Sequence, residues 1–398
     1  MAETDVAIVG AGAAGLSLAH RMSLDASARP APSVVLITPP AGPLVPPRRT
    51  WCYWETGPGA YDAAVTGSWE WLRTRDRHGA AAERRISPMR YKMMRSDDFQ
   101  TLIDGDLKAR TGVRRMEATV DDITALPDGT TRVRAVDADG ARVTVDARWA
   151  FDSRPPRRLP AARTHLLQHF KGWYLRTEEP SFDPEVVDLM DFRTSQPARG
   201  LSFGYVLPTS RRTALVEYTE FGPEPLSSDA YDTALNHYAH RVLGLGTIRV
   251  LWSETGVIPM TDAAFPRESA ASVFRIGTAG GATRPATGYT FAAIQRQVDA
   301  VARSVRTGRR PVPPPAYPAR SRMMDAVLLR ALATGRVDGP DFFHRLFSRV
   351  PPRRLLRFLD GRTHLYEDVA IGLRTPVARM LRTAAELPLV PRRPSPRN

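Results

Sequence analysis

Cysteine is almost absent from this sequence of 398 residues, in which Cys52 is the only one. A single cysteine cannot form an internal disulfide, so the sequence excludes the small disulfide-rich secreted class and is typical of a reducing compartment. No run of about 18 apolar residues occurs, which excludes a membrane-spanning helix. Because a strand-like pattern begins by residue 5, we expect no signal peptide and a cytoplasmic protein.

Lysine is nearly as scarce, since only three of the 56 basic residues are lysines. The formal net charge is +14, and residues 316–398 contribute much of it, with 16 arginines against seven acidic residues. A basic region of this kind suits nucleic acid or an anionic membrane surface. The sequence contains no zinc-ligand spacing, helix-turn-helix or aromatic-glycine RNA motif, so we expect no nucleic-acid partner.

Glycine, by contrast, is concentrated in two segments that carry chemistry. The first, residues 10–15, follows an apolar strand pattern at 5–9 and opens a helical pattern at 16–22. In dinucleotide-binding folds such glycines make a tight turn, let the backbone approach a pyrophosphate and let the helix pack on the strand. The helix N-terminus offers free N–H groups to the phosphates. We therefore predict a pyrophosphate site at Gly10, Gly12, Ala13, Ala14 and Gly15.

The second glycine segment, residues 277–291, follows a strand pattern at 273–276 and precedes a helix predicted from about 290 to 305. A domain that binds only a nicotinamide cofactor does not need it. A flavoprotein that returns to its first domain to hold the ribityl chain and flavin ring does. We therefore predict FAD contacts from Gly277, Thr278, Gly280, Gly281, Gly288 and Tyr289.

Thr38 departs from the dinucleotide pattern. It ends the second predicted strand, at 34–38, where an Asp or Glu is expected to bind the ribose hydroxyls. The threonine hydroxyl or a backbone group can substitute at Thr38, but as a weaker acceptor. A flavin-free binding or regulatory protein therefore stays open as an alternative.

The order of helical and strand patterns predicts an α/β fold. We expect a Rossmann-like FAD-binding domain with an inserted antiparallel-sheet substrate domain and a helical C-terminal region. Helical patterns of the C-terminal region cover 318–334, 340–359 and 375–387. The predicted division is 1–155 with 270–308 for FAD (45–93 partly facing substrate), 156–269 for substrate and catalysis, 309–319 for a proline-rich linker, and 320–398 for the basic helical region.

Six motifs in order resemble one family. They are Gly10–Gly15, Arg49–Glu55, Gln168–Trp173, Leu215–Thr219, Glu254–Met260 and Gly277–Phe291. This series is similar to the lycopene β-cyclase family, the soluble bacterial and plant-type flavin-dependent carotenoid cyclases. The similarity runs from about residue 4 to about residue 310 and more loosely to the end.

The resemblance implies a peripheral membrane enzyme that cyclises the linear end groups of lycopene, or of a related linear carotenoid, into β-ionone rings. Lycopene would become β-carotene through γ-carotene without net oxidation or reduction. The resemblance also implies reduced FAD, with NADPH or NADH as reductant, and allows contact with other carotenoid-pathway enzymes. The nearest alternative is an FAD- and NAD(P)H-dependent monooxygenase, epoxidase or prenyl-chain reductase of the same fold.

Protonating an unactivated alkene requires a strong acid, which a carboxylic acid kept protonated in an apolar pocket can supply. Glu217 stands in a strand pattern among apolar residues, and alternation places it on the face of Leu215 and Thr219. It also occupies the acidic-motif position of the family, so we predict that Glu217 is the catalytic acid; a solvent-exposed edge glutamate is the alternative. Glu220 faces the other way and is the reserve candidate.

Two further residues take their roles from the resemblance. Glu254 lies in a family segment that should approach the flavin, which makes it a second catalytic candidate, although it could equally pair with an arginine. Arg95 opens a helix predicted at 94–111 and matches a flavin-phosphate arginine of related enzymes; a solvent-exposed helix arginine is the alternative. Asp191 is a weaker candidate.

A carbocation also needs electron-rich faces, and cation–π contacts are worth about 0.5–2 kcal/mol each. We predict substrate contacts from some of Trp51, Trp54, Phe170 and Trp173, and expect that most of these aromatics are core. The eight histidines show no ligand spacing, so we predict no metal site, and structural roles for His165 and His169.

Apolar clusters beside arginines mark the C-terminal region, at residues 323–329, 342–347 and 353–358. Basic amphipathic helices of this kind suit an anionic membrane surface, where a long polyene dissolves. We predict reversible membrane contact through these clusters. The alternative is that their apolar faces pack on the catalytic domains.

Overall fold

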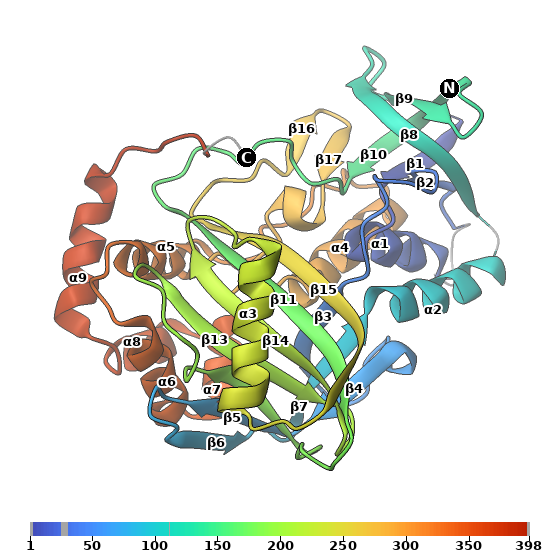
Figure 1. Ribbon diagram of the computed structural model, residues 1–398. Helices are drawn as coiled ribbons and strands as arrows, with labels where there is room; N and C mark the ends of the chain where they lie inside the picture. Colours follow the sequence, from blue (N-terminus) through green and yellow to red (C-terminus); the bar gives the residue numbers. More distant parts are fainter. Residues whose placement is uncertain (1–2, 25–30, 111, 396–398) are drawn as a thin grey trace.

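Three sheets organise the chain (Figure 1), and the computed structural model describes residues 3–24, 31–110 and 112–395. The first sheet has the order β1 (Thr4–Val9), β2 (Val34–Thr38), β8 (Val113–Ala125), β9 (Thr131–Asp137), β10 (Arg142–Asp152), β17 (Val273–Arg275) and β16 (Glu268–Ala270), with β1 also paired to β10. The second has the order β15 (Ile248–Thr261), β11 (His165–Thr177), β14 (Thr213–Gly222), β13 (Leu201–Pro208), β12 (Val186–Asp191), β5 (Trp71–Arg75) and β6 (Ala81–Arg85). The third has the order β3 (Thr50–Thr56), β7 (Met89–Arg95) and β4 (Val65–Trp69).

The helices fall into three groups according to where they lie. Helices α1 (Ala13–Ser23), α2 (Ser96–Lys108) and α4 (Phe291–Arg306) lie beside the first sheet. Helix α3 (Ser228–His237) lies beside the second sheet and continues into a π-helical turn (Tyr238–Val242). The C-terminal group is α5 (Ala319–Ala333), α6 (Gly339–Arg349), α7 (Pro352–Leu359), α8 (Leu365–Gly372), α9 (Val377–Glu386) and the short turn η4 (Leu387–Leu389). Short 3-10 turns lie at Asp62–Ala64 (η1) and Gly277–Gly280 (η3).

The first sheet has the predicted dinucleotide-binding arrangement. Strand β1 pairs in parallel with β2 on one side and with β10 on the other, and β17 joins β10 in parallel. A core of α1, α2 and α4 side chains covers one face, while the β8–β9–β10 meander packs its own apolar core on the other. Late strand β17 and helix α4 return to the first strands. The predicted fold class, α/β with a helical C-terminal region, is confirmed.

The second sheet is antiparallel along β15, β11, β14 and β13. Helix α3 covers one face, where Trp173, Val216 and Tyr218 pack with its side chains. Alternate residues of β11 and β14, which include Gly172 and Glu217, point to the opposite face. That inner face looks toward the three-stranded sheet and the C-terminal helices.

Residues 65–95 hold strands that the sequence patterns did not predict. Strands β4 and β7 complete the small sheet with β3, and β5 and β6 extend the second sheet beside β12. The predicted division assigned 45–93 to the FAD-binding part, partly facing substrate. In the structure this stretch contributes β3, β4 and most of β7 to the small sheet, and β5 and β6 to the second sheet.

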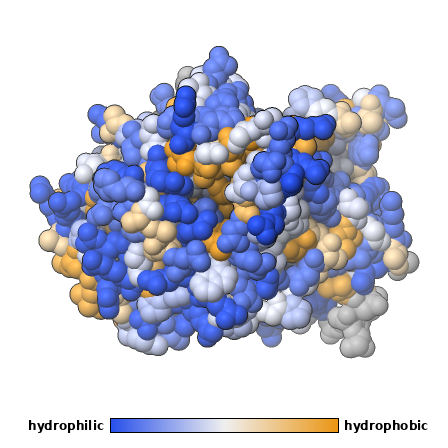
Figure 2. Space-filling view, turned by 60° about the horizontal axis from the view of Figure 1, so that its bottom comes forward, coloured by the Kyte–Doolittle hydropathy of each residue, from blue (hydrophilic) through white to orange (hydrophobic). Residues whose placement is uncertain are grey.

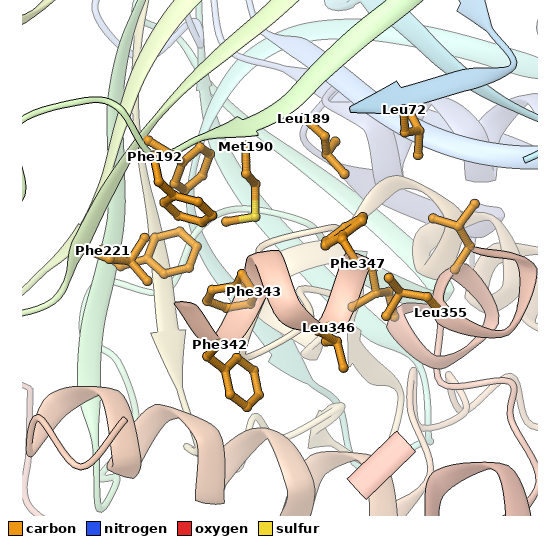
Figure 3. Close-up of a cluster of buried hydrophobic side chains, with 14 of the residues drawn as sticks. Leu72, Leu189, Met190, Phe192, Phe221, Phe342, Phe343, Leu346, Phe347 and Leu355 are labelled. Atoms are coloured by element: carbon orange, nitrogen blue, oxygen red, sulfur yellow. The ribbon is translucent and has the colours of Figure 1, made fainter. Parts of the chain in front are cut away.

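The apolar clusters at 342–347 and 353–358 are core. Phe342, Phe343 and Phe347 of α6 are buried, and they pack with Met190, Phe192 and Phe221 of the second sheet region (Figure 3). The prediction that these clusters contact a membrane is therefore wrong, because their apolar faces are consumed by packing on the inner face of the sheet.

The C-terminal helices also differ from the predicted pattern in number. The pattern at 340–359 is divided at Pro351 and Pro352 into α6 and α7, because proline lacks the N–H that a continuous helix needs. Helix α8 was not predicted, and the last three residues of the predicted 320–398 region lie outside the described part. Among the described residues no helix is long and apolar enough to cross a bilayer.

We predict that Phe343→Ala lowers the free energy of unfolding by about 3–5 kcal/mol, because it leaves a cavity where α6 meets the sheet. Urea unfolding followed by circular dichroism measures the change. Leu365→Ala, at an exposed position of α8, is the control and should stay within about 0.5 kcal/mol. Equal effects of the two substitutions would contradict the assignment of Phe343 to the core.

Candidate active site

The two glycine segments meet in the structure. A Cβ atom placed on Gly277 would lie 2.9 Å from Cβ of Ala14, so turn η3 rests on the first turn of α1. Gly10 has a φ of +95°, in the region that favours glycine, and a Cβ on Gly15 would lie 1.8 Å from the carbonyl oxygen of Gly10. Only glycine can therefore close this strand–turn–helix junction.

The junction fits a dinucleotide. Gly12, the N-cap of α1, has no side-chain cap, and a Cβ placed on it would meet nothing within 4 Å. The first N–H groups of α1 thus carry no side-chain cap, and Gly12 leaves room for a group to approach the helix N-terminus, as a pyrophosphate does. Gly288 and Gly281, with φ of +74° and +77°, give the second segment its return turns.

Thr38 lies at the end of β2, half-buried, and pairs in register with Glu117 of β8. The neighbouring strand thus brings a carboxylate beside the position where the dinucleotide pattern expects one. Arg95 is the N-cap of α2, and its Nε lies 2.7 Å from Oδ2 of Asp98. That hydrogen bond raises the pKa of Arg95, and its role toward a flavin phosphate stays a prediction.

Two glutamates face each other across a glycine on the inner face of the second sheet. Gly172 of the central strand β11 pairs in register with Glu217 of β14 on one side and with Glu254 of β15 on the other. Directly opposite residues of antiparallel strands point to the same face. Gly172 has no side chain, so nothing from β11 separates the two carboxyl groups.

Glu217 lies in an environment that favours its protonated form. It is 7% exposed, and Thr219 Oγ1 donates a hydrogen bond of 2.5 Å to its Oε1. Burial, reinforced by the negative charge of Glu254, raises the pKa of Glu217 to about 8, although the Thr219 hydrogen bond opposes the shift. A neutral carboxylic acid is therefore the dominant form near pH 7.

Glu254 lies in a different environment. Burial raises its pKa, but Thr50 and the positive charges of Arg49 and Arg48 oppose that shift. The backbone N–H of Thr50 donates to Oε2 of Glu254 at 2.9 Å, while Oε1 is buried with no hydrogen-bond partner among the described residues. The pair is thus asymmetric, because the surroundings of Glu254 oppose protonation through Thr50, Arg49 and Arg48, whereas those of Glu217 include only the Thr219 hydrogen bond.

The site extends from Glu217 to three tyrosines. Tyr205 of β13 pairs in register with Glu217, and its hydroxyl contacts that of Tyr91. The Tyr91 hydroxyl lies 3.0 Å from that of Tyr289. We call Tyr91, Tyr205 and Tyr289 the tyrosine cluster. Burial raises the pKa of the neighbouring Cys52 thiol to about 12, so the thiol stays protonated.

Of the predicted substrate aromatics, two lie at this site. The Trp54 ring packs edge-on against Tyr289, with centroids 4.7 Å apart, and stacks with Tyr91 at 6.3 Å. Phe170 pairs in register with Thr219, two residues from Glu217 along β14. Its ring covers Gly256, where an added Cβ would lie 2.3 Å from Cζ of Phe170.

The other two predicted aromatics lie elsewhere. Trp51 stacks on Phe291 at 5.7 Å in the core of the first sheet's helices, because it points to the opposite side of β3 from Trp54. Trp173 is buried under α3. The prediction of substrate contact by these two does not fit their placement.

Glu220 and Asp191 lie away from the pair of Glu217 and Glu254. Glu220 faces α3, where Tyr218 donates a hydrogen bond of 3.1 Å to it. Asp191 accepts hydrogen bonds from Arg193 at 2.9 Å and from Tyr238 at 3.1 Å. His169 contacts Tyr231 at 2.8 Å, and burial lowers its pKa to about 4, which leaves it neutral.

The sequence patterns missed Tyr91, Tyr205 and the role of Gly172. Tyr91 comes from a strand that was not predicted, and the cluster forms only where strands β7 and β13 meet the second glycine segment. Gly172 stood within a recognised motif, but its value depends on the register of two neighbouring strands. Within the described ranges, no group of His, Cys, Asp and Glu side chains could hold a metal ion.

Known proteins resemble this chain in sequence and in fold. The family described as lycopene cyclase protein matches residues 5–385. The lycopene beta-cyclase of Pseudescherichia vulneris is 33% identical over 149 residues, which are 36% of this chain and 38% of that relative. The match thus spans well under half of the relative's length.

Solved structures show the fold. A geranylgeranyl bacteriochlorophyll reductase-like protein of Thermoplasma acidophilum is 11% identical with a TM-score of 0.61, over 96% of this chain and 99% of that one. A flavoprotein/dehydrogenase of Cytophaga hutchinsonii is 14% identical with a TM-score of 0.61, over 96% and 98%. Aklavinone-11 hydroxylase, in complex with FAD and aklavinone, is 16% identical with a TM-score of 0.56, over 86% and 66%. The fold is that of FAD-binding flavoproteins.

We predict that Glu217→Gln raises the free energy of unfolding above pH 8 and changes it little below about pH 4.5. The carboxyl titrates near 4.5 when unfolded and near 8 when folded, so the folded protein binds the proton more tightly. Wild-type stability therefore falls as pH rises between these values, whereas glutamine carries no titrating group.

Urea unfolding of both proteins from pH 4 to 9 measures this difference. Glu185→Gln, at an exposed glutamate, is the matched control and should leave the pH profile unchanged. Parallel pH profiles for wild type and Glu217→Gln would contradict the shifted pKa.

Proposed function

Because the chain belongs to the lycopene cyclase family, as its motifs predicted, we propose that it cyclises the linear end groups of lycopene, or of a related linear carotenoid, into β-ionone rings. The observation that carries this proposal is the asymmetric pair of Glu217 and Glu254 across Gly172. A protonated acid and an ionised base on one apolar face are the two groups that an alkene cyclisation needs.

The proposed reaction begins at Glu217. Its carboxyl proton forms a new C–H bond with the terminal alkene and leaves a tertiary carbocation. The next double bond of the chain attacks this cation, which forms the ring C–C bond and moves the positive charge into the ring. Glu254 removes a ring proton, and the C–H electron pair becomes the ring double bond.

These reaction steps involve no net oxidation or reduction, and the two carboxyl groups can return to their starting protonation states within the site. Glu217 has lost one proton and Glu254 has gained one, so one proton transfer between them restores the starting state. The gap at Gly172 supports this transfer, because a side chain there would stand between the two carboxyl groups. A Cβ on Gly172 would lie 3.5 Å from Cβ of Glu217 and 3.1 Å from Cδ1 of Leu215.

Aromatic faces would stabilise the cation while it exists. Trp54, Phe170 and the tyrosine cluster line the side of Glu217, and each cation–π contact contributes about 0.5–2 kcal/mol. The buried hydroxyl groups of the cluster bond to one another, so they leave the aromatic faces available without presenting a nucleophile.

FAD is the proposed cofactor, with NADPH or NADH to keep it reduced. The residues that would hold it are Gly10, Gly12, Ala13, Ala14, Gly15, Thr38, Glu117, Arg95, Gly277, Thr278, Gly280, Gly281 and Gly288. Reduced flavin, when bound, supplies a negative charge that stabilises a nearby cation electrostatically. The open N-terminus of α1 and the glycine cradle of η3 support this assignment.

Expression of the chain in cells that make lycopene tests the proposal, with pigments separated by chromatography. We expect γ-carotene and β-carotene to appear, with NAD(P)H consumed far below one equivalent per ring. Lycopene left unchanged by flavin-loaded protein would contradict the proposal. One NAD(P)H per product would indicate a reductase or monooxygenase instead.

Glu217→Gln should retain flavin and lose about 10²–10⁴-fold of the cyclisation rate, because it removes the general acid. Glu220→Gln is the matched control, since this second strand glutamate lies on the opposite face, and it should keep most of the rate. The wild-type rate should fall as pH rises above about 8, as Glu217 ionises. Equal rates for Glu217→Gln and wild type would eliminate this acid.

The membrane surface is proposed at a different place from the one predicted. Helices α8 and α9 and turn η4 carry apolar side chains that are each more than half exposed: Leu365, Tyr366, Val369, Leu373, Leu381 and Leu389. Exposed Arg374, Arg379 and Arg382 lie among them. Figure 2 shows hydrophobic residues along the left edge, the side of α8 and α9 in Figure 1. We call this set the C-terminal apolar surface; its mixture of apolar and basic groups suits anionic lipid.

Leu373→Asp/Leu381→Asp should abolish flotation with vesicles that contain phosphatidylserine, because it places two carboxylates on the C-terminal apolar surface. Val250→Asp/Leu251→Asp is the control, since it changes two exposed apolar residues of β15. Absence of vesicle binding by the intact chain, or equal binding by both variants, would contradict this assignment.

A further inference from the structure

Arg284, in the second glycine segment, is a buried cation with no part in the proposed acid–base chemistry. It is 1% exposed, and its Nε lies 2.7 Å from Oδ2 of Asp325, a residue of α5 that is itself 4% exposed. A buried ion pair is a weak source of stability, since apolar side chains of similar size often replace one without loss. Its presence between a cofactor segment and a distant helix therefore calls for a geometric explanation.

The C-terminal region closes around this pair. The Arg284 guanidinium lies over the ring of Tyr317 at 5.0 Å and over that of Phe358 at 5.8 Å. Gly361 covers it with a φ of +67°, and a Cβ there would lie 3.0 Å from Nη1 of Arg284. A Cβ at Gly361 would crowd both the guanidinium and the Tyr317 ring, and its φ of +67° also favours glycine.

The same region holds the backbone of the glycine segment. Arg284 N donates to the carbonyl of Tyr289, and Gly288 N donates to the carbonyl of Arg284, both at 2.9 Å. The Tyr317 hydroxyl lies 3.2 Å from the carbonyl oxygens of Ala282 and Tyr289. The turn from 284 to 289 is thus closed on itself and tied to the start of the C-terminal region.

This turn ends at the active site. The Tyr289 side chain joins the tyrosine cluster and contacts Trp54, and Gly288, a proposed flavin contact, precedes it. A displacement of the turn would therefore move a wall of the substrate site and a part of the flavin cradle together.

We propose that the Arg284–Asp325 pair and the Tyr317 hydroxyl form a positioning device through which the C-terminal helices hold the flavin-contacting turn and Tyr289 in place. This proposal rests on the proposed flavin site. In it, Arg284, Asp325 and Tyr317 act through the turn that they hold. None of the three is placed in contact with the reacting atoms.

The test replaces the pair by apolar side chains of similar size, in Arg284→Met/Asp325→Leu of the full chain. Circular dichroism melting checks the fold, flavin fluorescence titration gives the FAD dissociation constant, and the visible absorption of bound flavin reports its surroundings. We expect an unchanged melting temperature, a dissociation constant raised about tenfold or more, and flavin bands shifted toward those of free FAD.

Asp341→Leu/Arg345→Met is the control, because it removes an exposed ion pair of α6 far from the turn, and it should change neither the dissociation constant nor the bands. A folded Arg284→Met/Asp325→Leu protein with wild-type FAD affinity and bands would overturn the proposal. If that variant does not fold, Tyr317→Phe decides, since it removes only the hydroxyl; unchanged affinity and bands would overturn the proposal equally. Failure of the wild-type chain to bind FAD would instead defeat the proposed function.

Discussion

The structure depends on one electrostatic constraint, a carboxylic acid kept out of water beside a second carboxyl group. Glu217 and Glu254 stand on one face of the second sheet on either side of Gly172, which has no side chain to stand between them. A charged pair in this position would be strongly unfavourable, so one member must hold a proton. The Thr50 N–H and the arginines beside Glu254 favour the ionised form of Glu254, while burial raises the pKa of Glu217 to about 8 and favours its protonated form.

The rest of the fold keeps this pair dry and positioned. Helix α3 covers the outer face of the sheet, so the inner face alone can form a site. The C-terminal helices bury the far part of that inner face, and the three-stranded sheet supplies Trp54 and Tyr91. The second glycine segment then reaches from α1 to the tyrosine cluster, which joins the proposed flavin cradle to the acid.

The sequence was sufficient for the elements whose signals are local. The strands at 5–9 and 34–38, the two glycine segments and the face shared by Glu217, Leu215 and Thr219 could be predicted because turn chemistry and alternation act over a few residues. The surroundings of Glu217 could not, since Tyr91, Tyr205 and Glu254 reach it through the pairing of distant strands. Amphipathic patterns could not distinguish buried α6 from exposed α9 either, because an apolar helix face has the same sequence pattern whether it packs on protein or lies at a surface.

Infrared difference spectroscopy of wild type against Glu217→Gln measures the protonation state of Glu217. At pH 7 the wild-type protein should show a protonated-carboxyl C=O band that the variant lacks. This band should disappear as the pH is raised past about 8, the pKa of the buried group. A carboxylate signal for Glu217 at pH 7, with no protonated-carboxyl band in the difference spectrum, would contradict the account.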